Sequence, residues 1–166
     1  MRILTAKQIK AVEENAFKTD STEAGLMLNA GTASFEKICK IFGECIVNSR
    51  VAVFCGNGKN AGDGFVIADL LNSINVNADI IICDKEPTVD EPKMYFDKAI
   101  ANGVKATNFT DIGENSYDII VDCIFGIGFH AQPRAPFSEI FDYINNSNAK
   151  VVSIDTPSGT NSTDGS

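Results

Sequence analysis

Short apolar runs alternate with helical segments along most of the chain, and this alternation restricts the fold more than any other feature. The first run, Val51–Cys55, is continuous, the second run is Ala78–Cys83, and a helical segment follows each of them. A continuous apolar run of this length is typical of a strand buried on both faces. Further strands are expected at 104–107, 117–121 and 150–154. The alternation predicts an α/β fold with a mainly parallel sheet between two layers of helices.

Helices are expected between the strands and ahead of the first strand. Thr5 and Gln8 form a capping box that predicts an N-terminal helix. A second helix is expected over 22–42, although Gly25 and Gly31 weaken it and would allow a break. The remaining helices are expected over 62–74, from Glu91 onward, and over 137–145.

Composition excludes several classes of protein. The 166 residues, 44% hydrophobic and 22% charged, fit one globular domain. A net charge of −8 without a basic cluster argues against nucleic-acid binding. No apolar run approaches the length of a membrane span, and the polar N-terminus does not resemble a secretion signal. Five cysteines without a CxxC pair, and one histidine, predict reduced thiols in a cytoplasmic protein and no zinc site.

The turn after the first buried strand is rich in glycine. Gly56, Gly58 and Ala61 satisfy the loose dinucleotide-binding pattern, and Asp79 or Asp84 lies where such folds place an acid for the ribose. A tight structural turn would explain the same glycines equally well. Asp63 is expected at the start of the next helix, where it would repel a phosphate. It is therefore either a helix-start residue or a sign that the ligand presents another group here.

Two more acids follow strands, and ligands of such sheets bind beyond the carboxyl ends of the strands. Asp122 precedes a Gly-x-Gly turn, and Asp155 begins the segment Asp-Thr-Pro-Ser-Gly. A turn-forming role is the alternative for both acids. Asn60, Asp122 and Ser158 offer the oxygen ligands of a hard cation, and their single negative charge suits a monovalent ion. Asp63 and Asp155 then remain for proton transfer.

These segments resemble the NAD(P)H-hydrate epimerase family, whose domain is the Rossmann-like YjeF N-terminal domain. The matching motifs are Gly58–Gly64, Asp122–Gly128 and Ser153–Gly159, and Met27–Gly31 in the second helix is similar as well. The resemblance covers nearly the whole chain. It implies one YjeF N-terminal-like domain over 1–166, a three-layer sandwich with N-terminal helices, which we expect to be truncated at its C-terminal end.

The resemblance implies an enzyme of nicotinamide-nucleotide repair that interconverts the R and S forms of hydrated NADH and NADPH at C6 of the nicotinamide ring. It also implies a potassium ion at Asn60, Asp122 and Ser158, a homodimer, and a dehydratase partner that uses the S form. Proton transfer at C6 is assigned to Asp155, with Asp63 as helper. Substrate binding is assigned to Lys59, Asn60, Ala61, Gly62, Asp63, Gly126, Ile127, Gly128, Phe129, His130, Ala131, Gln132 and Asp155.

The sequence departs from the family pattern at two positions of the glycine-rich motif. Lys59 replaces an Asn and Ala61 replaces a Gly; Lys59 would either favour a phosphorylated substrate or lie on the surface as a solvated lysine. Arg134 is a candidate phosphate contact. The alternatives to an epimerase are a non-catalytic nucleotide- or protein-binding scaffold and a dinucleotide-dependent oxidoreductase, for which a second substrate domain is missing.

Overall fold

A computed structural model describes residues 8, 22–88, 90–113, 116–127 and 134–160. The capping threonine Thr5 lies outside the described residues. Five strands form a single sheet in the order β3-β2-β1-β4-β5, and every neighbouring pair is parallel. The strands are β1 (Arg50–Cys55), β2 (Asn77–Ile82), β3 (Lys105–Asn108), β4 (Ile119–Cys123) and β5 (Lys150–Ser153). The predicted α/β fold with a parallel sheet is confirmed.

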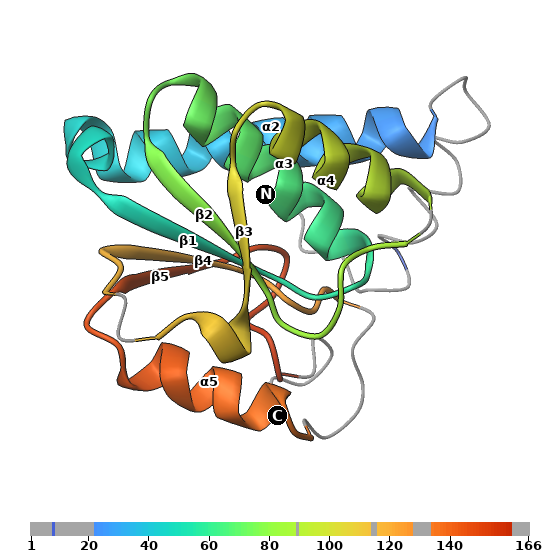
Figure 1. Cartoon of the computed structure of the whole chain (residues 1–166). Coiled ribbons are helices and arrows are strands. Elements are labelled where there is room, and N and C mark those ends of the chain that lie inside the picture. Colours follow the sequence, from blue (N-terminus) through green and yellow to red (C-terminus); the bar gives the residue numbers. More distant parts are fainter. Residues whose placement is uncertain (1–7, 9–21, 89, 114–115, 128–133, 161–166) are drawn as a thin grey trace.

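Helices cover both faces of the sheet (Figure 1). Three of them, α2, α3 and α4, lie on one face, and α5 lies on the other. Their bounds are α2 (Glu23–Phe42), α3 (Lys59–Ser73), α4 (Asp90–Ala101) and α5 (Phe137–Asn146), with short 3-10 helices η1 (Gly43–Asn48) and η2 (Phe109–Asp111). In the described part of the chain, no helix is both long and apolar enough to cross a membrane.

The two faces of the sheet carry separate apolar cores. Val51, Val53 and Cys55 of β1 pack toward α3, in a core that includes Phe65 and Phe96. The intervening Ala52 and Phe54 pack on the α5 side, with Ile120 and Ile140. Successive residues of a strand point to opposite faces, so the apolar stretch Val51–Cys55 of β1 packs against both layers of helices.

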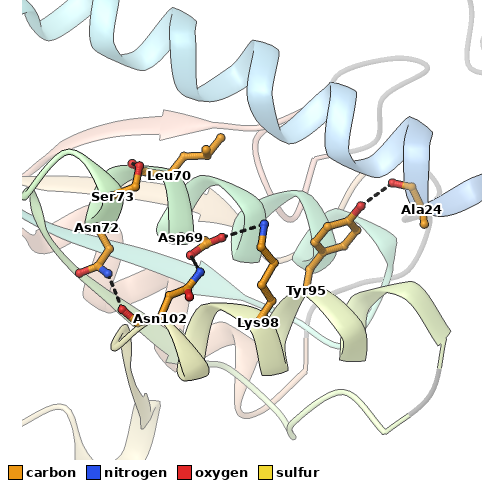
Figure 2. Close-up of polar contacts among 8 residues, drawn as sticks. All are labelled: Ala24, Asp69, Leu70, Asn72, Ser73, Tyr95, Lys98 and Asn102. Carbon is orange, nitrogen blue, oxygen red and sulfur yellow. Dashed lines mark hydrogen bonds and ion pairs between the residues drawn. The ribbon is translucent and has the colours of Figure 1, made fainter.

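Polar contacts hold the three helices of the first layer together (Figure 2). Tyr95 on α4 donates from Oη to Ala24 O on α2 at 2.7 Å. Asp69, a buried acid on α3, accepts a 2.7 Å hydrogen bond from Asn102 Nδ2, and its other oxygen lies 3.2 Å from Lys98 Nζ. Because these partners satisfy both oxygens of Asp69, α3 and α4 meet at a defined register.

Several elements differ in extent from those predicted. α2 is continuous across Gly25 and Gly31, and α3 begins at Lys59, three residues before the predicted start. β4 runs to Cys123, so that Asp122 is the penultimate residue of the strand rather than the first residue after it. The predicted weak strand over 104–107 exists as β3, shifted by one residue.

Candidate functional site

The carboxyl ends of β1, β4 and β5 meet at one edge of the sheet. β1 and β4 are neighbours in space although α3, β2, α4 and β3 separate them in sequence, so the strand order changes direction between them. Crevices at such a change of direction are the usual binding sites of open α/β sheets. The predicted site residues come from four segments that reach this crevice: the start of α3, the end of β4, the turn at Gly126 and the segment after β5.

Asp122 is the centre of a hydrogen-bond network at this edge. Its buried carboxylate accepts from Ser158 Oγ at 2.5 Å and from Ile124 N at 3.2 Å through Oδ1. Its Oδ2 accepts from Ser158 N at 2.9 Å and from Ser153 Oγ at 3.1 Å. The acid thereby joins the end of β4 to the end of β5 and to the turn that follows. Asp122 and Ser158, two of the predicted cation ligands, are thus in direct contact.

Asn60 presents an oxygen that the protein leaves without a hydrogen bond. The residue is 7% exposed, and its Nδ2 donates to Phe125 O at 3.0 Å and to Ile154 O at 3.4 Å. Its Oδ1 is buried and has no hydrogen-bond partner among the described residues. A buried polar atom without a partner has a substantial free-energy cost, which a ligand could offset. Ser158 Oγ and the carboxylate of Asp122 belong to the neighbouring network and are, like this amide oxygen, ligands of the kind that a hard cation takes.

Asp155 stands two residues beyond β5 in an unusual backbone conformation. Its φ is +66°, a region that residues other than glycine seldom adopt and that Asp and Asn tolerate best. A Cβ added to Gly126 would lie 2.9 Å from Asp155 Oδ2 and 3.5 Å from Asn60 Cβ. The absence of a side chain at Gly126 therefore lets both the acid and the amide side chain lie close to this turn. Although Asp155 is exposed, partial burial of its carboxyl raises its pKa.

Asp63 lies near the same cluster but does not begin the helix. It is half-buried in the second turn of α3, and no acidic residue occupies the first turn. The pKa of the Cys123 thiol is raised mainly by burial, and the charges of Asp63 and Asp155 raise it further. Both carboxylates therefore lie near the end of β4. The predicted conflict between Asp63 and a phosphate at the helix start is removed, because the first turn is free of negative charge.

The start of α3 is open on its outer side. Gly58 is the N-cap and supplies no side-chain hydrogen bond, and a Cβ added there would meet nothing within 4 Å. Gly56, by contrast, packs closely against Ile124, where a Cβ would lie 2.5 Å from the carbonyl oxygen. Lys59 forms an ion pair with Glu23 of α2. The uncapped N–H groups of a helix start favour a negatively charged or electron-rich ligand group.

The structure brings together five of the predicted site residues. Asn60, Gly126, Asp122, Asp155 and Ser158 gather at one edge, and Arg134 is exposed. Five predicted substrate residues lie outside the described part of the chain: Gly128, Phe129, His130, Ala131 and Gln132. In the described residues, no group of three or more His, Cys, Asp or Glu side chains could hold a metal ion.

Sequence reasoning missed two contributors to the network. Ser153 donates to Asp122, and the main chain of Phe125 links two of its members: its N–H donates to Ser158 Oγ at 2.9 Å and its carbonyl accepts from Asn60. Ser153 is the last residue of β5, after two valines, and lies beside Asp122 in the register of β4 and β5. A polar residue at the carboxyl end of a predicted strand is the available sequence signal for Ser153. No sequence signal marks a main-chain contact such as that of Phe125.

Comparison with known proteins gives a consistent picture. A family model described as YjeF-related protein N-terminus matches residues 23–166. The chain is 36% identical to an NAD(P)H-hydrate epimerase of Plasmodium vivax, over 87% of this chain and 50% of that protein. It is 32% identical to a bifunctional NAD(P)H-hydrate repair enzyme Nnr of Dictyoglomus turgidum, over 99% of this chain and 33% of that enzyme. The chain thus spans half or less of these relatives.

A solved structure has the same fold. The crystal structure of yeast ynu0 (YNL200c) superposes with a TM-score of 0.86, covering 97% of this chain and 72% of the yeast chain. The two sequences are 23% identical, so this likeness concerns the fold alone.

Proposed function

The chain belongs to the family of YjeF-related protein N-termini, and from this membership we propose that it epimerises the hydrates of NADH and NADPH at C6 of the nicotinamide ring. The observation that carries the proposal is the position of Asp155: an accessible acid with a raised pKa, next to Gly126 and Asn60 at the sheet edge where dinucleotides bind. Relatives at 36% and 35% identity are named NAD(P)H-hydrate epimerase, which supports the same reaction.

Epimerisation at C6 requires a proton to move to or from the hydroxyl oxygen. In one route, protonated Asp155 gives its proton to the hydroxyl, the C6–O bond breaks with its electron pair leaving on water, and the nitrogen lone pair forms an iminium. Water then adds to the other face and returns a proton to the carboxylate. In the other route, the carboxylate takes the hydroxyl proton while the N–C6 bond breaks with its electron pair on the ring nitrogen, which takes a proton and leaves an open-chain aldehyde. The nitrogen then attacks the opposite face of the aldehyde carbon and loses its proton, and the carboxyl returns its proton to the oxygen. A raised pKa suits either task.

The two routes differ in their dependence on pH. The iminium route begins from the protonated acid, so kcat/KM falls as pH rises through the pKa of Asp155. Ring opening begins from the carboxylate, so kcat/KM rises over the same interval. The pH profile, corrected for the spontaneous rate, therefore identifies the form of Asp155 that starts the reaction.

We propose potassium as the resident cation. Asn60 Oδ1, the Asp122 carboxylate and Ser158 Oγ would hold it, which is consistent with the buried Asn60 oxygen that has no protein partner among the described residues. When bound, the ion would supply a fixed positive charge for an electron-rich part of the substrate. Asn60 and Ser158 hydrogen-bond to the main chain of Phe125, and Asp122 accepts from Ile124 N, so the three residues hold the turn against which the nicotinamide end would be placed.

We also propose that the product is passed to a dehydratase that acts on the S form. The Dictyoglomus relative is named as a bifunctional repair enzyme, and the present chain matches 33% of it. A homodimer and a cytoplasmic location stay predictions.

The decisive experiment measures epimerisation of the purified R hydrates of NADH and NADPH, coupled to an S-specific dehydratase. We expect acceleration over the spontaneous rate, and a loss of about 100-fold or more in Asp155→Asn. Asn tolerates the positive φ at position 155, so the variant should keep its fold and Tm. Asp142→Asn, on the exposed surface of α5, is the matched control and should keep full activity. Full turnover by Asp155→Asn would contradict the proton-transfer role.

A second measurement tests the cation site. Replacing potassium by sodium should slow the wild type, and Asp122→Asn should require about tenfold more potassium for the same rate, because one negative charge is lost from the site. The Asp142→Asn control should respond to potassium as the wild type does. An unchanged potassium response in Asp122→Asn would exclude this site.

A further inference from the structure

The end of β2 carries an acid that the proposed chemistry does not use. Asp84 follows β2 by two residues, and Cys83 N donates to Cys55 O at 2.9 Å, so the pairing with β1 continues up to this point. Asp84 is exposed, and its Oδ2 accepts a 2.7 Å hydrogen bond from Asn57 Nδ2. Asn57 lies in the glycine-rich turn after β1, so the bond ties the acid to the rim of the same crevice.

The other acid considered from the sequence, Asp79, is placed elsewhere. It lies within β2, opposite Ala52 in the middle of β1. Its Oδ2 accepts from Tyr117 Oη at 3.1 Å and lies 3.9 Å from the guanidinium of Arg50, the first residue of β1. The contacts of Asp79 therefore lie toward the amino ends of the strands. Of the two acids, Asp84 is the one that lies at the carboxyl ends.

Asp84 and Asp155 mark the two ends of the crevice. The strands in between follow the order β2-β1-β4-β5, which makes three strand spacings, or about 14 Å. The open start of α3 lies after β1, between the two acids. Dinucleotides lie across such crevices with the diphosphate at the helix start after the first strand. A nicotinamide at Asp155 and a diphosphate at α3 would place the adenosine ribose at the end of β2.

We propose that Asp84 contacts the adenosine ribose and makes the protein prefer the hydrate of NADH to the hydrate of NADPH. The inference rests on the proposed function, because it names the preferred substrate of the same site. A carboxylate accepts hydrogen bonds from ribose hydroxyls and repels a phosphate at the 2′ position. The nearby cations do not reverse this effect: Lys59 pairs with Glu23, and Lys85, beside Asp84, is followed by the acidic Glu86.

The test compares kcat/KM for the R hydrates of NADH and NADPH in the wild type and in single variants. We expect the wild type to favour the NADH hydrate by about tenfold or more, Asp84→Asn to bring the ratio near one, and Asp84→Arg to invert it. Asn at 84 can still accept the hydrogen bond from Asn57, so its turn should persist. Asp142→Asn, which removes the same charge from a distant helix, should keep the wild-type ratio.

A binding measurement separates this inference from the proposed reaction. Calorimetry with ADP-ribose and its 2′-phosphate reports the ribose preference without any turnover. If neither hydrate is epimerised but ADP-ribose binds more tightly than its 2′-phosphate, and Asp84→Asn abolishes the difference, the reaction is wrong and the role of Asp84 stands. A wild-type ratio near one, a ratio unchanged in Asp84→Asn, a ratio that depends on Lys85→Ala instead, or the absence of both turnover and binding would overturn the role of Asp84.

Discussion

Asp155 holds its carboxyl in place through its own backbone. The residue adopts a φ of +66°, and a side chain with a Cβ is strained there unless it can bond locally, as Asp and Asn do. Replacing Asp155 by Ala therefore removes the carboxyl and also strains the turn. Asn is the substitution that isolates the chemistry of the carboxyl from the conformation of the turn, and results with Ala should be interpreted with this difference in mind.

The raised pKa of Asp155 predicts how stability depends on pH. The folded state disfavours the charged carboxylate, so this group destabilises the fold progressively as pH rises from its ordinary value of 3.8 through the raised pKa. Asn cannot ionise and lacks this dependence. We expect the Tm of Asp155→Asn, relative to the wild type, to be higher at pH 7 than at pH 3.5, measured by thermal unfolding. A difference in Tm that is constant with pH would contradict the raised pKa.

The cysteines divide into reactive and protected thiols. Cys45 is exposed, whereas Cys55, Cys83 and Cys123 are buried, and burial raises the pKa of each of these three thiols. Because the thiolate is the reactive form, we expect alkylation of Cys45 first, with the three buried thiols labelled only on unfolding. Mass spectrometry of peptides after timed iodoacetamide treatment gives the order. If Cys123 in the native protein were labelled as fast as Cys45, the prediction that Cys123 is protected by burial would be wrong.

At the scale of secondary structure, glycine brings helices close to their neighbours. A Cβ on Gly31 of α2 would lie 2.6 Å from Val66 Cβ on α3. We expect Gly31→Ala to lower the free energy of unfolding by about 1–3 kcal/mol, because this contact outweighs the gain in helix propensity. Gly25→Ala is the matched control in the same helix, since its Cβ would approach only the Thr22 hydroxyl, at 3.2 Å. Equal stability of both variants in urea denaturation would contradict the close packing.

Much of the fold could be predicted from the sequence, but the start of α3 could not. The strands follow from their apolar runs, and the acids at 122 and 155 follow from their positions near strand ends. The glycine-rich segment reads as a turn by propensity, yet α3 already begins at Lys59. A Cβ on Gly64 would lie 2.8 Å from Cys55 Sγ, and one on Gly62 would collide with Met27. These glycines serve the approach of α3 to the sheet and to α2, a tertiary contact that local sequence patterns do not contain.

At the scale of the whole molecule, protection should decrease from the centre of the sheet to its edges. β1 and β4 consist almost entirely of buried residues, whereas β3 and β5 contain no buried residue. We expect amide hydrogen exchange to be slowest in β1 and β4 and faster in β3 and β5. Peptide-resolved exchange followed by mass spectrometry measures this order. Exchange in β5 as slow as in β1 would show that the edge of the sheet is as well protected as its centre, contrary to this prediction.

The strand order also affects how the chain folds during its synthesis. β1 is made before the other strands, but its two neighbours are made at different times: β2 follows after one helix, and β4 only after α4 and β3. The half of the sheet made of β1, β2 and β3 can therefore form on the ribosome while the edge of β1 that pairs with β4 still has no partner. During that interval the nascent chain exposes an edge to which other chains can pair, so a slow ribosome or a shortage of chaperones would promote aggregation at this stage.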